Sequence, residues 1–447
     1  MPQARQIRPS YAEKFHCIGP ACEDTCCKGW NVPIDQATYE KYQSLPASPL
    51  RSLIDSSLLV NIQDADGTPP SSFANMRLVG DNLCPILAED GLCKIQSAYG
   101  EEFLSQTCTK YPRMVYLVGG IEEKSLTLSC PEAARLVLLN PDLLRSNASS
   151  TTELDLVPEM TGPIDDAAQS GQSLLAHYWP IRASVLSLIK NREYPLWQRL
   201  FLLGIFCRRL DSIAKGELHR PVAAFLQDFE ATLTAGSLRL AMETLPIDRT
   251  AQLDVVLRLA GLLLHRSNVG PRFADCIKAF TTGIGNGPSA TLESLAAHYI
   301  VAHDSYYAPF IERHPHILEN YLVNTVIRCQ FPFGREGTVP GSTPSLTREY
   351  ALLTAQFALM KGLLIGVAGY HRDFLVSEHV VHTIQSASKH FEHTPEFLKL
   401  THALLLESQM DTARGLAILL RNSETPVSRI PSPVIQISEP QAGFQAY

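Results

Sequence analysis

The chain has 447 residues, carries a formal net charge of −7 and is 45% hydrophobic, which is enough for two or three domains with a sizeable core. A negative charge balance offers no electrostatic footprint for nucleic acid or for a polybasic membrane contact, so we expect neither partner. The N-terminus has no apolar signal segment, and the apolar stretch 357–368 is too short to cross a membrane. We therefore expect a soluble, cytoplasmic protein.

The N-terminal third of the chain is defined by its cysteines. Eight of the eleven cysteines lie in this third, and clustered thiols in a reducing compartment are more often metal ligands than disulfides. The eight are Cys17, Cys22, Cys26, Cys27, Cys84, Cys93, Cys108 and Cys130. Thiolates suit both zinc and iron–sulfur clusters, above all a [4Fe–4S] cluster. Four would satisfy one such site and eight could serve two, whereas the alternative interpretation is a set of buried structural cysteines.

The remaining elements follow in chain order. The N-terminal part predicts a short helix over 38–45 and two short strands over 114–120 and 125–129. A polar linker at 146–152 then separates it from sequence in which apolar residues recur at helical spacing. Helices are predicted over 173–191, 196–215, 222–235, 250–265, 290–302, 316–329, 346–368, 374–390 and 396–420.

These elements predict a mainly α protein. An irregular cysteine-rich metal-binding domain, residues 1–145, packs on an all-α helical domain, residues 146–425, and residues 426–447 form a flexible tail. Within the helical domain, the glycine-rich stretch 283–287 is either a methyltransferase-like loop or an ordinary interhelical loop. His379 and His382 have metal-ligand spacing on a helix, although such pairs are more often simply solvated.

Three cysteine motifs carry a resemblance to a known family. They are the Cys17-x4-Cys22-x3-Cys26-Cys27 run, the Cys84-Pro85 and Cys93-Lys94 pair, and Cys108-Thr109-Lys110-Tyr111-Pro112-Arg113. Together they resemble the cysteine-cluster domain described as zinc- or iron-chelating. With Ser129-Cys130-Pro131-Glu132, Asn320-Tyr321 and Phe331-Pro332-Phe333, residues 8 to 400 resemble the flagellin lysine-N-methylase family.

The resemblance implies transfer of a methyl group to the ε-amine of flagellin lysines, with S-adenosylmethionine as the donor and flagellin as the protein partner. Such a reaction needs a lysine that is desolvated and deprotonated. Two alternatives stay open from the residues alone: a non-enzymatic metal-binding interaction module, and an iron–sulfur redox or radical enzyme.

The predicted catalytic residues come from both domains. Tyr111 and Arg113 follow the ligand candidate Cys108, while Asn320 and Tyr321 lie on a helix that precedes the apolar segment 331–333. Ligand pockets favour domain interfaces, so we expect these two sets to face one another across a groove. The alternative is that both sets serve domain packing alone.

Overall fold

The computed structural model describes residues 5–7, 9–29, 32–61, 72–80, 82–118, 120–143, 174–264, 269–334, 345–392 and 394–423. The predicted linker at 146–152 and the predicted tail at 426–447 lie outside these residues, so the predicted domain boundary stays a prediction. Within the described part, buried apolar residues form two separate clusters, a small one between residues 32 and 95 and a large one that includes every long helix.

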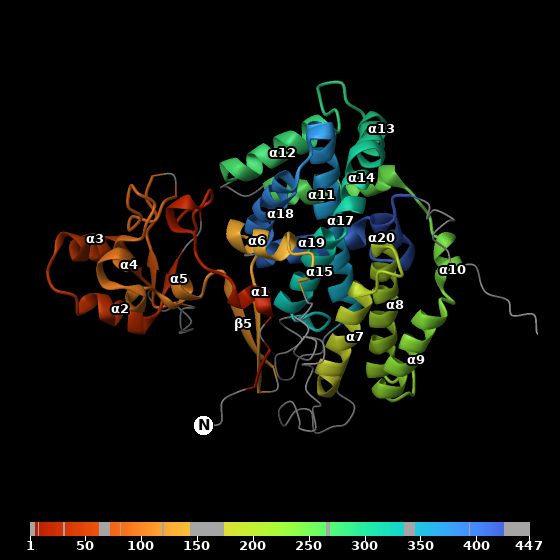
Figure 1. The fold of residues 1–447 in the computed structure, drawn as a ribbon, viewed down its shortest axis with the longest axis horizontal. Helices are drawn as coiled ribbons and strands as arrows, with labels where there is room; N and C mark the ends of the chain where they lie inside the picture. Colours follow the sequence, from red (N-terminus) through yellow and green to blue (C-terminus); the bar gives the residue numbers. More distant parts are fainter. Residues whose placement is uncertain are drawn as a thin grey trace, which may run out of the picture.

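The small cluster is the core of a cysteine-bearing lobe that stands to one side of the helical body (Figure 1). Its sheet is antiparallel in the order β2–β4–β3, and its helices are short. Asp35 caps the first of them by accepting from Thr38 N, and Ser48 caps the second by accepting from Arg51 N. The elements are β2 Pro33–Ile34, α2 Gln36–Gln43, α3 Pro49–Ser57, β3 Leu58–Val60, β4 Ala74–Met76, α4 Lys94–Tyr99, η2 Glu101–Phe103 and α5 Gln106–Lys110.

A second sheet connects this lobe to the body. Strand β5 (Arg113–Val118) pairs antiparallel with β6 (Ile121–Leu126), and β1 (Arg5–Ile7) joins β6 in parallel. The helix α1 (Ser10–Glu13) and the helix α6 (Pro131–Leu138) flank the sheet, and their apolar residues belong to the large core. The N-terminal segment and residues 113–143 therefore pack with the helical body although the cysteine lobe intervenes in sequence.

The predicted helical character of the C-terminal region is confirmed. Most helices begin and end close to their predicted residues, but the predicted helix over 396–420 is wrong in one respect, because it is broken into two around Gln409, which has a φ of 56°. The elements are η4 Leu174–His177, α7 Tyr178–Lys190, α8 Leu196–Ala214, α9 Val222–Ala235, α10 Arg239–Glu243, α11 Arg249–Leu264, α12 Pro271–Gly283, α13 Leu292–Ala302, η5 His303–Tyr307, α14 Ala308–Arg313, α15 His316–Arg328, α17 Leu346–His371, η6 Arg372–Phe374, α18 Ser377–Phe391, α19 Pro395–Glu407 and α20 Ala413–Leu420.

Helix α12 was not predicted, and its position settles the glycine-rich stretch. Gly283 is the last residue of α12, so a helix and not a strand leads directly into the glycine-rich stretch. The stretch is therefore an interhelical loop. The glycine is needed for packing: a Cβ built on Gly283 would lie 1.8 Å from the carbonyl oxygen of Gly366 in α17. The two helices therefore approach to backbone contact, which places the side chains of α12 and α17 around one shared pocket.

Helix α17 is the centre of the body. It is long and apolar enough to cross a membrane by length and composition, but the apolar window is entirely buried inside the protein, as in a core helix. Its one buried lysine, Lys361, donates to the carbonyl oxygens of Leu419 at 3.0 Å and Leu420 at 2.8 Å, at the C-terminus of α20. A lysine there satisfies helix-end carbonyls that would otherwise be orphaned in the core.

Candidate functional site

Four of the predicted metal ligands are neighbours within the cysteine lobe. The main chain of Cys84 donates to the carbonyl of Cys27 at 2.8 Å, which joins the first cysteine run to the second. A tight hairpin, closed by Ala88 N on Leu92 O at 2.8 Å, then returns the chain to Cys93. The charges of Cys27, Cys93 and Cys108 all help to raise the pKa of Cys84 to about 12, after the larger effect of burial.

The other four cysteines form a second neighbourhood at the junction with the body. Burial raises the pKa of Cys130 to about 11, and the charges of Cys22 and Cys17 add to that rise. Cys26 lies between the two neighbourhoods, because its thiol hydrogen-bonds to Cys27 and it also feels the charges of Cys108 and Cys17. The charge effects on the thiol pKa values thus group the eight cysteines into two sets, which Cys26 links.

The two thiols of the adjacent pair Cys26–Cys27 differ in acidity. The hydrogen bond from Cys26 lowers the pKa of the Cys27 thiol to about 7, and it raises the pKa of Cys26 itself. Cys27 is therefore the thiol of this pair that ionises first. Thiolates are the form that binds metals, so this pair already has the electronic character of a ligand site.

These cysteines suit a metal by the chemical type of their donor atoms. In the part of the chain that the structure describes, no three His, Cys, Asp or Glu side chains are arranged so that they could hold a metal ion. One of the sulfurs accepts hydrogen bonds from the main chain. The N–H groups of Ala133 and Glu132, in the first turn of α6, hydrogen-bond to Cys130 and lower its pKa, which opposes the effect of burial. The metal-binding character of the lobe stays a prediction.

The predicted catalytic residues make contacts with different neighbours. Tyr111 lies beside the cysteines, where its hydroxyl is 3.1 Å from Ser129 Oγ. Burial raises the pKa of Tyr111, and the charges of Cys130 and Cys26 add to that rise. Arg113 Nη2 donates to Phe15 O at 3.0 Å, and its guanidinium lies over the Phe15 ring, 5.0 Å from the centroid. Both contacts fasten the start of β5 to the N-terminal segment.

Asn320 and Tyr321 bind α15 to its neighbours. Asn320 Nδ2 donates to Val137 O at 2.9 Å and to Asn140 O at 2.6 Å, which satisfies the C-terminal carbonyls of α6. Asn320 also lines a cavity of about 270 Å³ together with Glu319 and Arg192. Tyr321 is fully buried, and its hydroxyl has no hydrogen-bond partner among the described residues. The role of these residues in catalysis stays a prediction, and the contacts they make are those of packing.

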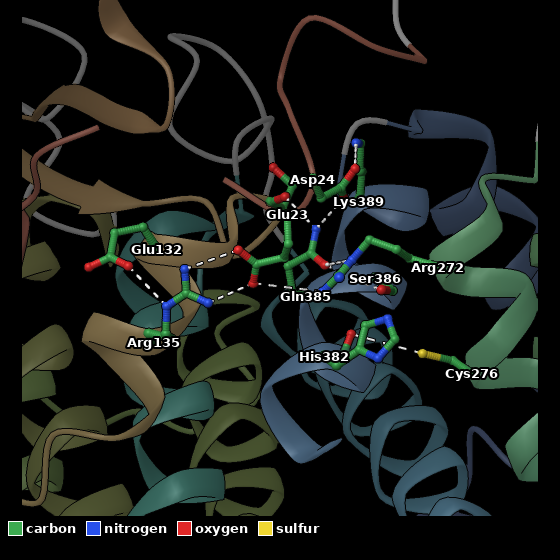
Figure 2. Close-up of polar contacts among 11 residues, drawn as sticks. Glu23, Asp24, Glu132, Arg135, Arg272, Cys276, His382, Gln385, Ser386 and Lys389 are labelled. Atoms are coloured by element: carbon green, nitrogen blue, oxygen red, sulfur yellow. Dashed lines mark hydrogen bonds and ion pairs between the residues drawn. The ribbon is translucent and has the colours of Figure 1, made fainter. Parts of the chain in front are cut away.

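Sequence reasoning missed the residues that hold the first cysteine loop against the body. Glu23 and Asp24, between Cys22 and Cys26, point at side chains of α6, α12 and α18 (Figure 2). Asp24 accepts from Lys389 Nζ at 2.7 Å and from Gln385 Nε2 at 2.8 Å. Glu23 pairs with Arg135 at 2.6 Å. The two acidic residues between cysteines were the only sign in the sequence that this loop makes ion pairs, but it did not identify their partners, which lie more than a hundred residues away.

Gln385 joins both cysteine segments of this junction. Its Nε2 also donates to Ser129 O at 2.8 Å, next to Cys130. His382, one turn earlier on α18, lies on the same face as Gln385 and lines a second cavity of about 270 Å³ between α12, α17 and α18. The predicted histidine pair, His379 and His382 of α18, thus lies in a cavity wall, where His379 also stacks on His371 of α17 with ring centroids 3.5 Å apart and 12° between planes.

Comparison with known proteins agrees with this architecture. The family model described as the FliB lysine N-methylase C-terminal domain matches residues 182–419, slightly more than half of the chain. The lysine-N-methylase of Salmonella typhimurium strain LT2 is 25% identical over 423 residues, which cover 90% of this chain and 95% of that protein. The flagellar biosynthetic protein FliU of Salmonella muenchen is 31% identical over 148 residues, or 32% of this chain and 83% of that protein. No solved structure matches.

The chain has a helical body with an N-terminal cysteine lobe, and a lysine-N-methylase matches 90% of its length. Its class is therefore that of lysine N-methyltransferases. Within that class, the chain belongs to the FliB lysine N-methylase family.

Proposed function

We propose that this enzyme methylates the ε-amines of flagellin lysines, with S-adenosylmethionine as the methyl donor and the cysteine lobe holding zinc or an iron–sulfur cluster. The family match over residues 182–419 carries the proposal. A relative named as a flagellar biosynthetic protein supports a flagellar substrate. Flagellin is made in the cytoplasm before export, so a cytoplasmic enzyme is consistent with this substrate.

The two neighbourhoods of thiols support the proposed metal or cluster. Each brings together donors from segments far apart in sequence, and the Cys27 thiol, with its pKa lowered to about 7, is ready to ionise on binding. Cys27, Cys84, Cys93 and Cys108 would hold one group, and Cys17, Cys22, Cys26 and Cys130 the other. A bound cluster would supply either a structural brace or redox chemistry, depending on whether iron is present.

The test is a methylation assay with the full chain. Protein purified without oxygen is incubated with flagellin and S-adenosylmethionine, and lysine methylation is read by peptide mass spectrometry while metal and sulfide are measured on the same sample. We expect methylated lysines in flagellin only when enzyme and donor are both present. Absence of methylation by protein that carries its full metal content would reject flagellin as the substrate.

Cysteine variants test the metal. We expect Cys27→Ser and Cys130→Ser to lose metal, each from a different neighbourhood, and to lose methyl transfer with it. Cys329→Ala is the matched control, because Cys329 is a half-buried cysteine of the body outside both sets. Full activity of metal-free Cys27→Ser protein would show that the reaction does not depend on the group.

A further inference from the structure

The cavity between α12, α17 and α18 has the size and lining of a small-molecule site. It measures about 270 Å³, and α17 and α18 contribute Tyr370, His371, His379 and His382 to its wall while α12 contributes Asp275 and Cys276. Close contacts hold the two helices that frame it, since a Cβ on Gly366 of α17 would collide with Phe280 of α12, and one on Gly369 would collide with the carbonyl oxygen of Gly283. The cavity is therefore preformed by close helix packing.

One wall of this cavity is a flat aromatic surface. The stacked rings of His371 and His379 present a ring face, and Tyr370 meets His371 edge-on, with centroids 4.9 Å apart and 86° between planes. Nucleobases bind to such surfaces by stacking, whichever base they carry. Burial lowers the pKa of His371, His379 and His382, which disfavours their charged forms.

The polar groups of the cavity are spaced for a nucleoside. Asp275 is exposed at the rim and can accept from sugar hydroxyls, and Lys278 beside it can pair with a carboxylate. His382 Nε2 is buried, and no described residue hydrogen-bonds to it. A neutral imidazole nitrogen in that position can pair with the edge of a base, since it donates or accepts according to its tautomer.

The shape of the cavity wall favours a ring over the alternative occupant, the lysine side chain of the protein substrate. The groups that face His382 are Arg272 and Asp275 from α12, Asp24 from the cysteine loop, and His379 and His371. Asp24 is paired with Lys389, and Arg272 with Glu23. These charges do not distinguish a sulfonium from an ammonium, whereas the stacked rings of His371 and His379 offer a flat surface that suits a base rather than an alkyl chain.

We propose that the cavity between α12, α17 and α18 binds the nucleoside half of the sulfonium methyl donor. The proposal rests on the proposed function, because methyl transfer to lysine is the reaction that would use this donor here. It also places the donor on the same faces of α12 and α18 that hold the cysteine loop, through Arg272 and Gln385. His382 and Gln385 are neighbours on α18, so the donor pocket and the cysteine junction share one helix wall.

Direct binding of S-adenosylhomocysteine, the product left after methyl transfer, tests the proposal without reference to activity. The full chain is titrated by calorimetry, and the site variants are His371→Ala, which removes the stacking face, and Asp275→Asn, which replaces the charged acceptor of the sugar hydroxyls by a weaker, neutral one. We expect each to weaken binding by about tenfold or more, as the loss of one stacking or hydrogen-bonding contact does. Methylthioadenosine should compete for the site, and methionine alone should not.

Matched controls separate the site from general damage. His402→Ala changes a partly buried histidine of α19, and Asp142→Asn changes an exposed aspartate at the other cavity; both should bind within about twofold of the parent protein. Parent-like binding in His371→Ala and Asp275→Asn, in protein that methylates flagellin, would overturn this site and leave the proposed function standing. Unchanged binding with a raised KM for flagellin would assign the cavity to the acceptor lysine. A parent protein that neither binds the product nor transfers methyl groups would overturn both.

Discussion

At the residue scale, buried ion pairs connect elements that are distant in sequence. The Arg182 guanidinium of α7 donates to Glu123 of β6 through Nε at 3.2 Å and Nη2 at 2.5 Å, and both side chains are almost fully buried. Its Nη1 also donates to Val326 O at 2.5 Å and Phe331 O at 2.6 Å. We expect Arg182→Met to lower the free energy of unfolding by about 3–5 kcal/mol, because it leaves a buried carboxylate unpaired. Urea denaturation followed by circular dichroism measures the loss.

The double variant Arg182→Met with Glu123→Leu provides the control. Removing both charges leaves no orphaned carboxylate, so we expect it to recover about half or more of the lost stability. A double variant less stable than Arg182→Met alone would mean that the hydrogen bonds from Arg182 to the main-chain carbonyls of Val326, Ile327 and Phe331 matter more than the pairing with Glu123.

At the element scale, the contact between α17 and α20 depends on a lysine that the core desolvates. Burial lowers the pKa of Lys361 to about 7, against 10.5 for an unperturbed lysine. Between these two pH values the unfolded chain binds a proton that the folded chain does not, so the free energy of unfolding contributed by this residue rises with pH. We expect the parent protein to gain up to about 1.4 kcal/mol per pH unit relative to Lys361→Met between pH 7 and 9. Thermal or urea unfolding at several pH values gives this difference.

The comparison with Lys361→Met is needed because buried tyrosines and cysteines, whose pKa values are raised, act in the opposite direction at alkaline pH. Lys278→Met, at an exposed position of α12, should show no such pH-dependent difference from the parent. A constant gap between parent and Lys361→Met from pH 6 to 9 would indicate that the oxygen acceptors around Nζ, which are the carbonyls of Leu419 and Leu420 and the side chain of Asn422, keep the ammonium charged.

At the scale of the whole molecule, the cysteine lobe and the helical body are joined at the loop that carries Glu23 and Asp24 (Figures 1 and 2). Gln385 and Lys389 of α18 hold this loop, and the Lys389–Asp24 pair is only partly exposed. We expect the double variant Gln385→Leu with Lys389→Met to speed amide exchange in residues 17–29 several-fold. The loop opens more easily because it has lost the contacts that Gln385 and Lys389 make with Asp24. Hydrogen-exchange mass spectrometry reads the loop and α17 in the same experiment.

Exchange in α17 should stay at the parent rate, since the core of the body is separate from that of the lobe. Lys399→Met, on the exposed side of α19, is the matched surface control. Equal exchange of the loop in all three proteins would show that Arg135 and Glu23 alone suffice to hold the lobe.

The sequence predicted the bounds of most helices well, but it did not predict which elements contact one another. Helices such as α8 and α9 follow from local apolar spacing and were predicted to within a residue or two at each end. Helix α12 was missed although its buried residues Phe273, Cys276 and Phe280 follow helical spacing, and the break between α19 and α20 depends on the left-handed backbone at Gln409. The predicted meeting of Arg113 with Asn320 required the relative placement of two elements, which local spacing does not contain.

By itself, the sequence determined the helical class of the body, the confinement of eight thiols to one third of the chain, and the family, because apolar periodicity and cysteine spacing are local properties. Tertiary structure alone decided that the thiols divide into two linked neighbourhoods, that residues 113–143 pack with the body, and that Asp24 meets Gln385 and Lys389. It also decided that α12, α17 and α18 enclose a cavity. These features depend on how buried surfaces fit together over hundreds of residues, and a helix pattern specifies which face is buried but not which helix covers it.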